Sequence, residues 1–123
     1  MSYYVGELTV GSTGNTSFTL PFNPSGLEFT IGQLSSGSEN DTAHLSVGMT
    51  DGTNSAAHSI MATSAGTTIT RRSTSYCLTH YAIVSGSTSR VISATLVSIV
   101  GTTVTLNFDR ATTDYTITVK AIA

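Results

Sequence analysis

The chain has 123 residues and a mass of 12.8 kDa, enough for one domain that closes its own hydrophobic core. Only 10% of the residues are charged, against about 25% in an average protein, while serine and threonine make up about a third of the chain and apolar residues 39%. The many β-branched residues indicate a folded chain, and a net charge of −2 with a pI near 5.8 gives no electrostatic reason to bind nucleic acid, which needs a basic surface.

A side-chain period of two predicts strands over most of the chain. In the first half the expected strands cover residues 3–10, 16–22, 27–34, 43–50 and 55–64. A polar loop is expected at 35–42, and the Asp51-Gly52 pair predicts a tight hairpin between the last two of these strands. The segment 55–64 contains alanine and methionine that could favour a helical turn, but its short length and its flanking turns indicate a strand.

The second and third expected strands meet at a corner. Apolar residues alternate with polar ones on both sides of it: Phe18, Leu20 and Phe22 before the corner, and Leu27, Phe29 and Ile31 after it. Between them, Asn23-Pro24-Ser25-Gly26 predicts a type I or type II turn in which Gly26 can take a positive φ. We interpret the corner as part of the hydrophobic core.

In the second half, strands are expected at residues 67–75, 76–85, 90–100, 102–111 and 114–123. The segments 76–85 and 90–100 carry apolar residues at both parities, which predicts strands covered on both faces, either in a central position or at a subunit contact. The last two strands alternate cleanly, and the residues expected to face inward are Val104, Leu106, Phe108, Tyr115, Ile117, Val119 and Ala121.

These elements predict an all-β fold: a single antiparallel β-sandwich or jelly-roll-like domain of about ten short strands over residues 1–123. We expect about half of the residues in strands, and the C-terminal strand within a sheet. The first residues lack the basic start and apolar run of a signal peptide, and no apolar stretch approaches the ~20 residues of a membrane-spanning helix. We therefore expect a protein made in the cytoplasm without a cleaved signal.

The acidic residues are scattered over turns and outward-facing positions: Glu7, Glu28, Glu39, Asp41, Asp51, Asp109 and Asp114. Nothing in their spacing favours the pair of facing carboxyls that a glycosidase needs. Asp109 is expected to cap a turn, and Arg110 to pair with Asp114.

Histidine and cysteine offer the remaining chemistry. His44, His58 and His80 lie on three different expected strands, so a metal site is conceivable, but no two of them have a diagnostic spacing. Cys77 is the single cysteine and is expected to be a small buried apolar group. We expect no catalytic, cofactor-binding or metal-binding residues, no cofactor and no enzymatic activity.

Two binding roles remain. A lectin would hold sugars on aromatic side chains, but the chain has no tryptophan and five tyrosines split between core and surface positions. A nearly uncharged surface rich in hydroxyl groups can be buried against another protein at modest desolvation cost. The doubly apolar strand with Ile92, Leu96 and Ile99 suggests a second burial surface, which closed oligomers commonly provide.

Four stretches together resemble small β-sandwich virion structural proteins of tailed bacteriophages: "LPFNPSGLEFTIG", "AHLSVGMTDGTN", "YCLTHYAIV" and "VTLNFDRATTDYTITVKAIA". The resemblance implies a virion component without catalytic residues, first of all a capsid decoration (cement) protein. Its partners would be the major capsid protein or other virion proteins and its own copies, with a trimer favoured, and neither nucleic acid nor a membrane. A tail or fibre-associated module and a lectin-like domain are the alternatives.

Overall fold

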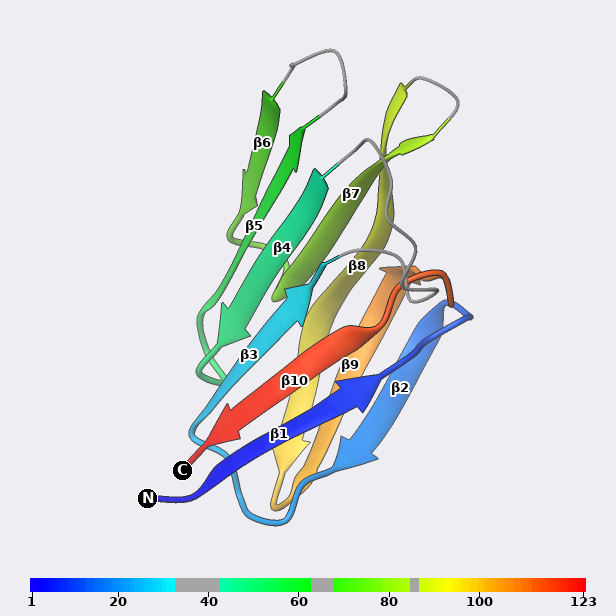
Figure 1. Ribbon diagram of the computed structural model, residues 1–123. Coiled ribbons are helices and arrows are strands. Elements are labelled where there is room, and N and C mark those ends of the chain that lie inside the picture. The colour runs from blue at the N-terminus through cyan, green and yellow to red at the C-terminus, as the bar shows by residue number, and fades with distance from the viewer. Residues whose placement is uncertain (33–42, 63–67, 85–86) are drawn as a thin grey trace.

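The computed structural model describes residues 1–32, 43–62, 68–84 and 87–123, which form strands and no helix (Figure 1). The strands are β1 (Tyr3–Leu8), β2 (Gly14–Thr19), β3 (Gly26–Ile31), β4 (Ala43–Thr50), β5 (Ser55–Ala62), β6 (Thr68–Ser73), β7 (Leu78–Val84), β8 (Ser87–Val100), β9 (Thr103–Arg110) and β10 (Ile117–Ile122). They occupy more of the chain than the expected half. The expected polar loop at 35–42, with Glu39 and Asp41, lies outside the described residues.

Two antiparallel sheets pack face to face, so the predicted all-β sandwich is confirmed. One sheet has six strands in the order β1-β10-β3-β4-β5-β6, and the other has four in the order β2-β9-β8-β7. The C-terminal strand β10 lies within a sheet, as predicted, and its neighbours there are β1 and β3. Figure 1 shows the two termini side by side. There the backbone N–H of Ala123 donates to the carbonyl of Ser2 at 3.1 Å.

The corner between β2 and β3 carries the chain from the four-stranded sheet to the six-stranded one. Its apolar residues do enter the core: Leu20, Leu27, Phe29 and Ile31 are buried, and Phe18 and Phe22 are half-buried and packed against them. Gly26 does not take the expected positive φ, which among the described glycines occurs at Gly14, Gly52 and Gly101. Gly26 instead begins β3, and the preceding residue, Ser25, already donates its N–H to the carbonyl of Ile122 at 2.8 Å.

The inward positions predicted for the last two strands are confirmed. The side chains of Val104, Leu106, Phe108, Tyr115, Ile117, Val119 and Ala121 are all at most 5% exposed. Alternation alone therefore places both strands correctly, because each side chain of a strand points to the face opposite its neighbour's.

Strand β8 owes its apolar residues at both parities to a bulge. Its register against β9 shifts between Leu96 and Ser98, which leaves Val97 as an extra residue without a partner on β9. Before the bulge the even-numbered residues face the core, and after it the odd-numbered ones do. Leu96 and Ile99, three positions apart, both pack on the core, while Val97 is 51% exposed. The strand is interior to its sheet, one of the two expected positions, but it is not covered on both faces, since Val97 and Val100 are exposed. Strand β7, for which the same was expected, lies at the edge of the sheet. The apolar pattern of β8 therefore requires no second burial surface.

Candidate functional site

The solvent side of the six-stranded sheet, here called the outer face, gathers most of the exposed apolar side chains. Nine large apolar residues of the described chain are exposed, and six of them lie on this face. These six are Tyr3, Val5, Leu45, Met49, Ile60 and Ile122. Exposed apolar side chains gathered on one face mark a candidate surface for contact with another molecule.

The outer face is apolar at β4 because this strand directs its large apolar side chains to the solvent, whereas an ordinary sandwich strand directs them to the core. Leu45, Val47 and Met49 point outward, and Ser46 and Gly48 point into the sandwich. The reason is the close approach of the sheets, since a Cβ built on Gly48 would lie 1.9 Å from the carbonyl oxygen of Cys77. Only small side chains fit on the inner side here, which leaves the larger apolar residues of β4 on the solvent side.

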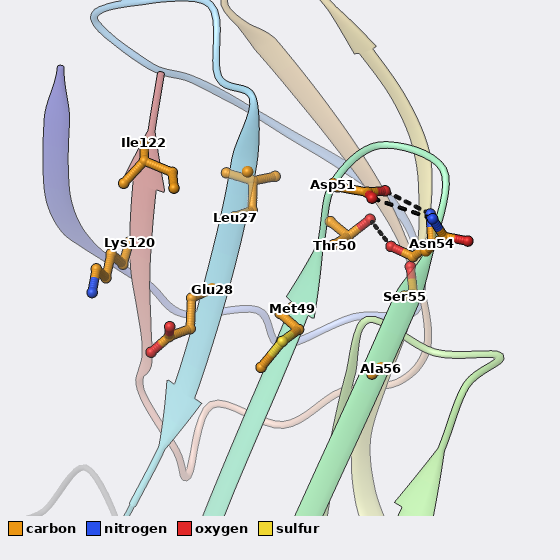
Figure 2. Close-up of a pocket in the computed structure, with 11 residues that line it drawn as sticks. Leu27, Glu28, Met49, Thr50, Asp51, Asn54, Ser55, Ala56, Lys120 and Ile122 are labelled. Carbon is orange, nitrogen blue, oxygen red and sulfur yellow. Dashed lines mark hydrogen bonds between the residues drawn. The ribbon is translucent and has the colours of Figure 1, made fainter. Parts of the chain in front are cut away.

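A hollow of about 470 Å³ lies on the outer face across β10, β3, β4 and β5 (Figure 2). Ile122, Met49 and Ala56 contribute apolar surface to it, and Glu28 and Lys120 contribute charge. Such a size and a largely apolar lining suit a few side chains of another protein or a small ligand.

Glu28 and Lys120 are cross-strand partners on β3 and β10, yet no ion pair between them occurs in the described part of the chain. The Nζ of Lys120 lies instead over the ring of Tyr3, 5.4 Å from its centre. Both charges therefore remain available to an incoming group.

One rim of the hollow is the β4–β5 hairpin, whose predicted tight turn is confirmed. The carboxylate of Asp51 accepts a hydrogen bond from the N–H of Asn54 at 2.7 Å (Figure 2) and another from the N–H of Thr53 at 2.9 Å. The bonds from Asn54 and then Thr53 lower the pKa of Asp51 below its ordinary value. Gly52 takes the positive φ of 97° that this turn requires.

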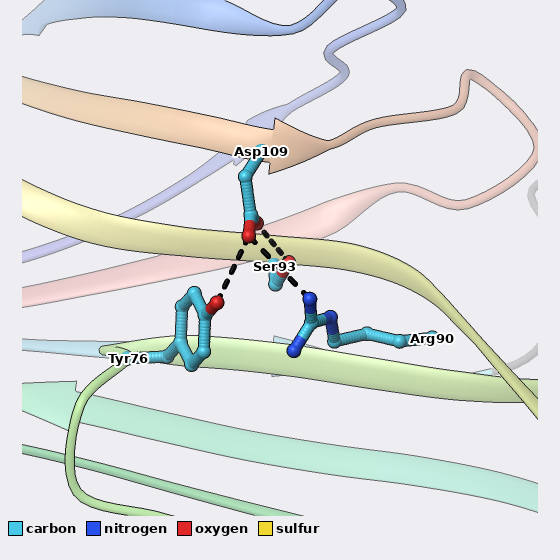
Figure 3. Close-up of polar contacts among 4 residues, drawn as sticks. All are labelled: Tyr76, Arg90, Ser93 and Asp109. Atoms are coloured by element: carbon cyan, nitrogen blue, oxygen red, sulfur yellow. Dashed lines mark hydrogen bonds and ion pairs between the residues drawn. The ribbon is translucent and has the colours of Figure 1, made fainter.

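A second polar group lies on the solvent side of the four-stranded sheet, around Asp109 (Figure 3). Tyr76 donates its hydroxyl to Asp109 at 2.9 Å, Ser93 donates to the other carboxylate oxygen, and Arg90 forms an ion pair with Asp109 at 3.5 Å. Partial burial raises the pKa of Asp109, but the bonds from Ser93 and Tyr76 and the charge of Arg90 outweigh this effect and lower it.

This group joins residues that the sequence analysis did not connect. Asp109 was expected to cap a turn, but it lies within β9, as the unpaired residue at a register shift against β8. The guanidinium of Arg90 covers the ring of Tyr76 at 5.0 Å, which occupies that aromatic face. The arrangement ties the segment before β7 to β8 and β9.

Two of the three histidines come together inside the sandwich. Nδ1 of His80 lies 2.6 Å from Oγ of Ser46, which lies 2.5 Å from Oγ of Ser59. The rings of His80 and His44 are 5.9 Å apart, and Tyr115 lies against His80 at 4.5 Å. Ser46 and His80 are fully buried, so in this structure the serine–histidine pair has no access to a substrate.

Burial controls the titration of this cluster and of the thiol. It lowers the pKa of His80 to about 4, with a smaller contribution from His44, and it also lowers the pKa of His44. Cys77 is buried as predicted, donates to the carbonyl of Ala94 at 3.4 Å, and has its pKa raised to about 12 by burial. A thiol in this state is not a nucleophile at neutral pH.

The remaining candidates stay apart. His58 points outward from β5, and among the described residues no three potential ligands (His, Cys, Asp or Glu) come together to hold a metal ion. Glu7 and Glu28 lie on the outer face, as expected for outward positions. No described residue belongs to a helix long and apolar enough to cross a bilayer.

Comparison with known protein families, with curated proteins and with solved structures found no match.

Proposed function

We propose that this chain is a non-enzymatic structural protein of a tailed-phage virion, most concretely a capsid decoration protein. It binds the head lattice, its own copies, or both, and its site of action is the virion. The observation that carries the proposal is the outer face of the six-stranded sheet, where six exposed apolar side chains lie on one surface. The four stretches that resemble phage virion proteins supply the biological setting.

The physical argument concerns the cost of burying this face. Hydroxyl and apolar side chains cover it, and only a few charges interrupt it, so docking removes little ionic hydration. Burial of the apolar area contributes about 25 cal/mol per Å² to association. A small domain with such a face gains more from docking to a large regular lattice than from remaining free.

The polar groups of the molecule also fit a structural role. The Asp109 group fastens three segments together, and the His80 group is closed off inside the sandwich. In both groups the polar side chains contact other residues of the same chain.

The lectin-like alternative has one observation in its favour. Tyr3 is 60% exposed at the edge of the outer face, and polar side chains such as Asn54 line the hollow beside it. A tail or fibre-associated module would use the same outer face on a different partner.

Binding to purified phage heads tests the proposal. The wild-type protein is expected to sediment with heads of the encoding phage, and mass spectrometry of purified virions is expected to detect it. An Ile60→Lys variant, which places a charge on the outer face, is expected to lose this binding. The matched control is Val100→Lys, since Val100 is 72% exposed on the other sheet.

A protein absent from purified virions, or equal binding by both lysine variants, would contradict the proposal. Saturable binding on a glycan array that is lost in Tyr3→Ala would favour the lectin-like domain instead.

A further inference from the structure

We propose that the part of the outer face formed by β1, β10, β3 and β4 binds a second copy of this chain in a two-fold, face-to-face pair. The inference deepens the proposed function by naming one partner of the outer face, and it rests on that function for its biological setting. The side chains on this part of the face complement themselves under a two-fold rotation.

The strand registers define the rows of side chains on this face. In one row Val5, Lys120, Glu28 and Met49 follow one another across β1, β10, β3 and β4. In the next row towards the termini, Ile122 of β10 lies beside Gly26 of β3. Side chains of one row share a height along the strands, so a rotation about an axis parallel to the strands keeps each row on itself.

A two-fold axis that runs between β10 and β3, in the plane of contact, places β10 of one copy over β3 of the other. Lys120 then faces Glu28 of the second copy, and Glu28 faces the second copy's Lys120. Each pair joins opposite charges that have no ion-pair partner within the described chain. Sheets packed in this way lie about 10 Å apart, a distance that a lysine and a glutamate span together.

The same rotation matches the shape of the surface. It places Ile122 over Gly26 of the second copy, so a large side chain meets a position without one. It also places β1 over β4, so that Val5 lies opposite Met49. Tyr3 and Val5, which are 60% and 54% exposed on β1, then enter the hollow of the other copy. The protruding half of one copy fills the recessed half of the other.

Ile60 lies on β5, further from the axis than β4, where the edge strand β1 of the second copy does not reach. Leu45 lies on β4 but beyond the level at which β1 ends at Leu8. The pair therefore leaves these two apolar residues free for the lattice. The two binding events can therefore be tested separately. Ile60→Lys tests binding to the head lattice, and substitutions at Glu28 and Lys120 test binding to the second copy.

The test is a charge exchange followed by sedimentation and light scattering of the purified full chain. Wild type is expected to form a dimer. Glu28→Lys and Lys120→Glu, each alone, are expected to weaken the dimer by about tenfold or more, because like charges then face each other. An equimolar mixture of the two variants is expected to recover a heterodimer, in which every facing pair is again opposite.

A cross-link provides a second readout that needs no variant. A zero-length carbodiimide reagent couples a carboxylate to an amine. Lys120 is the only lysine of the chain, so few different cross-links can form. In a mixture of unlabelled and isotope-labelled protein, a Lys120–Glu28 cross-link that carries both labels shows contact between copies.

The outcomes separate the two proposals. A monomer at every soluble concentration, a trimer, or a mixture of variants that associates no better than each alone overturns the two-fold pair. A dimer that fails to bind heads leaves the pair standing and overturns the proposed function. If the protein decorates heads but never dimerises, either in solution or by cross-linking on the particle, the proposed function stands and the two-fold pair is overturned.

Discussion

Gly48 shows how a single missing side chain shapes the molecule. A Cβ at this position would lie 1.9 Å from a backbone oxygen and 2.8 Å from the carbonyl carbon of Cys77, so β4 and β7 can meet only if residue 48 is glycine. We predict that Gly48→Ala lowers the free energy of unfolding by about 2–3 kcal/mol, because the sheets must separate.

Chemical denaturation of this variant gives the measurement, and Gly32→Ala is its control. A Cβ at Gly32 meets no atom of the described residues within 4 Å, and its φ is not positive, so a change within about 0.5 kcal/mol is expected. Equal effects of both substitutions would show that the close approach of the sheets is not limiting.

His80 makes stability depend on pH. Its pKa is about 4 in the folded protein and about 6.5 when unfolded, so between these values the unfolded chain binds the extra proton. Stability is therefore fully present above pH 6.5 and decreases as pH falls towards 4, by about 3 kcal/mol in total. His44, whose pKa burial also lowers, acts in the same direction.

Urea denaturation at several pH values from about 4 to about 7, which span the folded and unfolded pKa values of His80, measures this slope. His80→Asn keeps a group near Ser46 and is expected to flatten it. A slope that survives in His80→Asn would assign the dependence to other groups.

At the scale of elements, β3 and the corner before it differ in how deeply they enter the core. Phe29 is fully buried in β3, and Phe22 is half-buried in the corner. We predict that Phe29→Ala costs about 3–5 kcal/mol of unfolding free energy and Phe22→Ala roughly half of that. Thermal or chemical denaturation of the two variants checks the order, and a larger loss for Phe22→Ala would contradict it.

The alternation of side chains predicts where strands lie better than which face is covered. It located β4 at residues 43–50 and the inward residues of β9 and β10. It could not reveal that Gly48 faces the core and Met49 the solvent, because a period of two divides a strand into two faces without showing which face is buried. The bulge at Val97 was hidden for the same reason, since an extra residue looks like apolar residues at both parities.

The candidate sites depended even more on topology. Tyr76 and Ser93 reach Asp109 from 33 and 16 positions away, and no local motif connects them. His44 and His80 meet only because β4 and β7 belong to facing sheets. The composition led to the expectation of a surface suited to docking, but the location of the apolar face required the registers of the six-stranded sheet.

At the scale of the whole molecule, a face that binds another copy links stability to concentration. Association that occurs only in the folded state raises the unfolding temperature as protein is added. We predict that the midpoint of thermal unfolding of wild type rises with concentration, by a few degrees per tenfold change for a domain of this size (about 4–8 °C per kcal/mol).

Met49→Lys is expected to abolish this rise, because it places a charge opposite Val5 of the second copy in the apolar part of the face. Val100→Lys adds the same charge at an exposed apolar position of the other sheet, so it should keep the rise. Scanning calorimetry over a wide concentration range makes the comparison. A midpoint that is independent of concentration in wild type, or a rise that both variants retain, would place the contacts of this molecule elsewhere than on its six-stranded sheet.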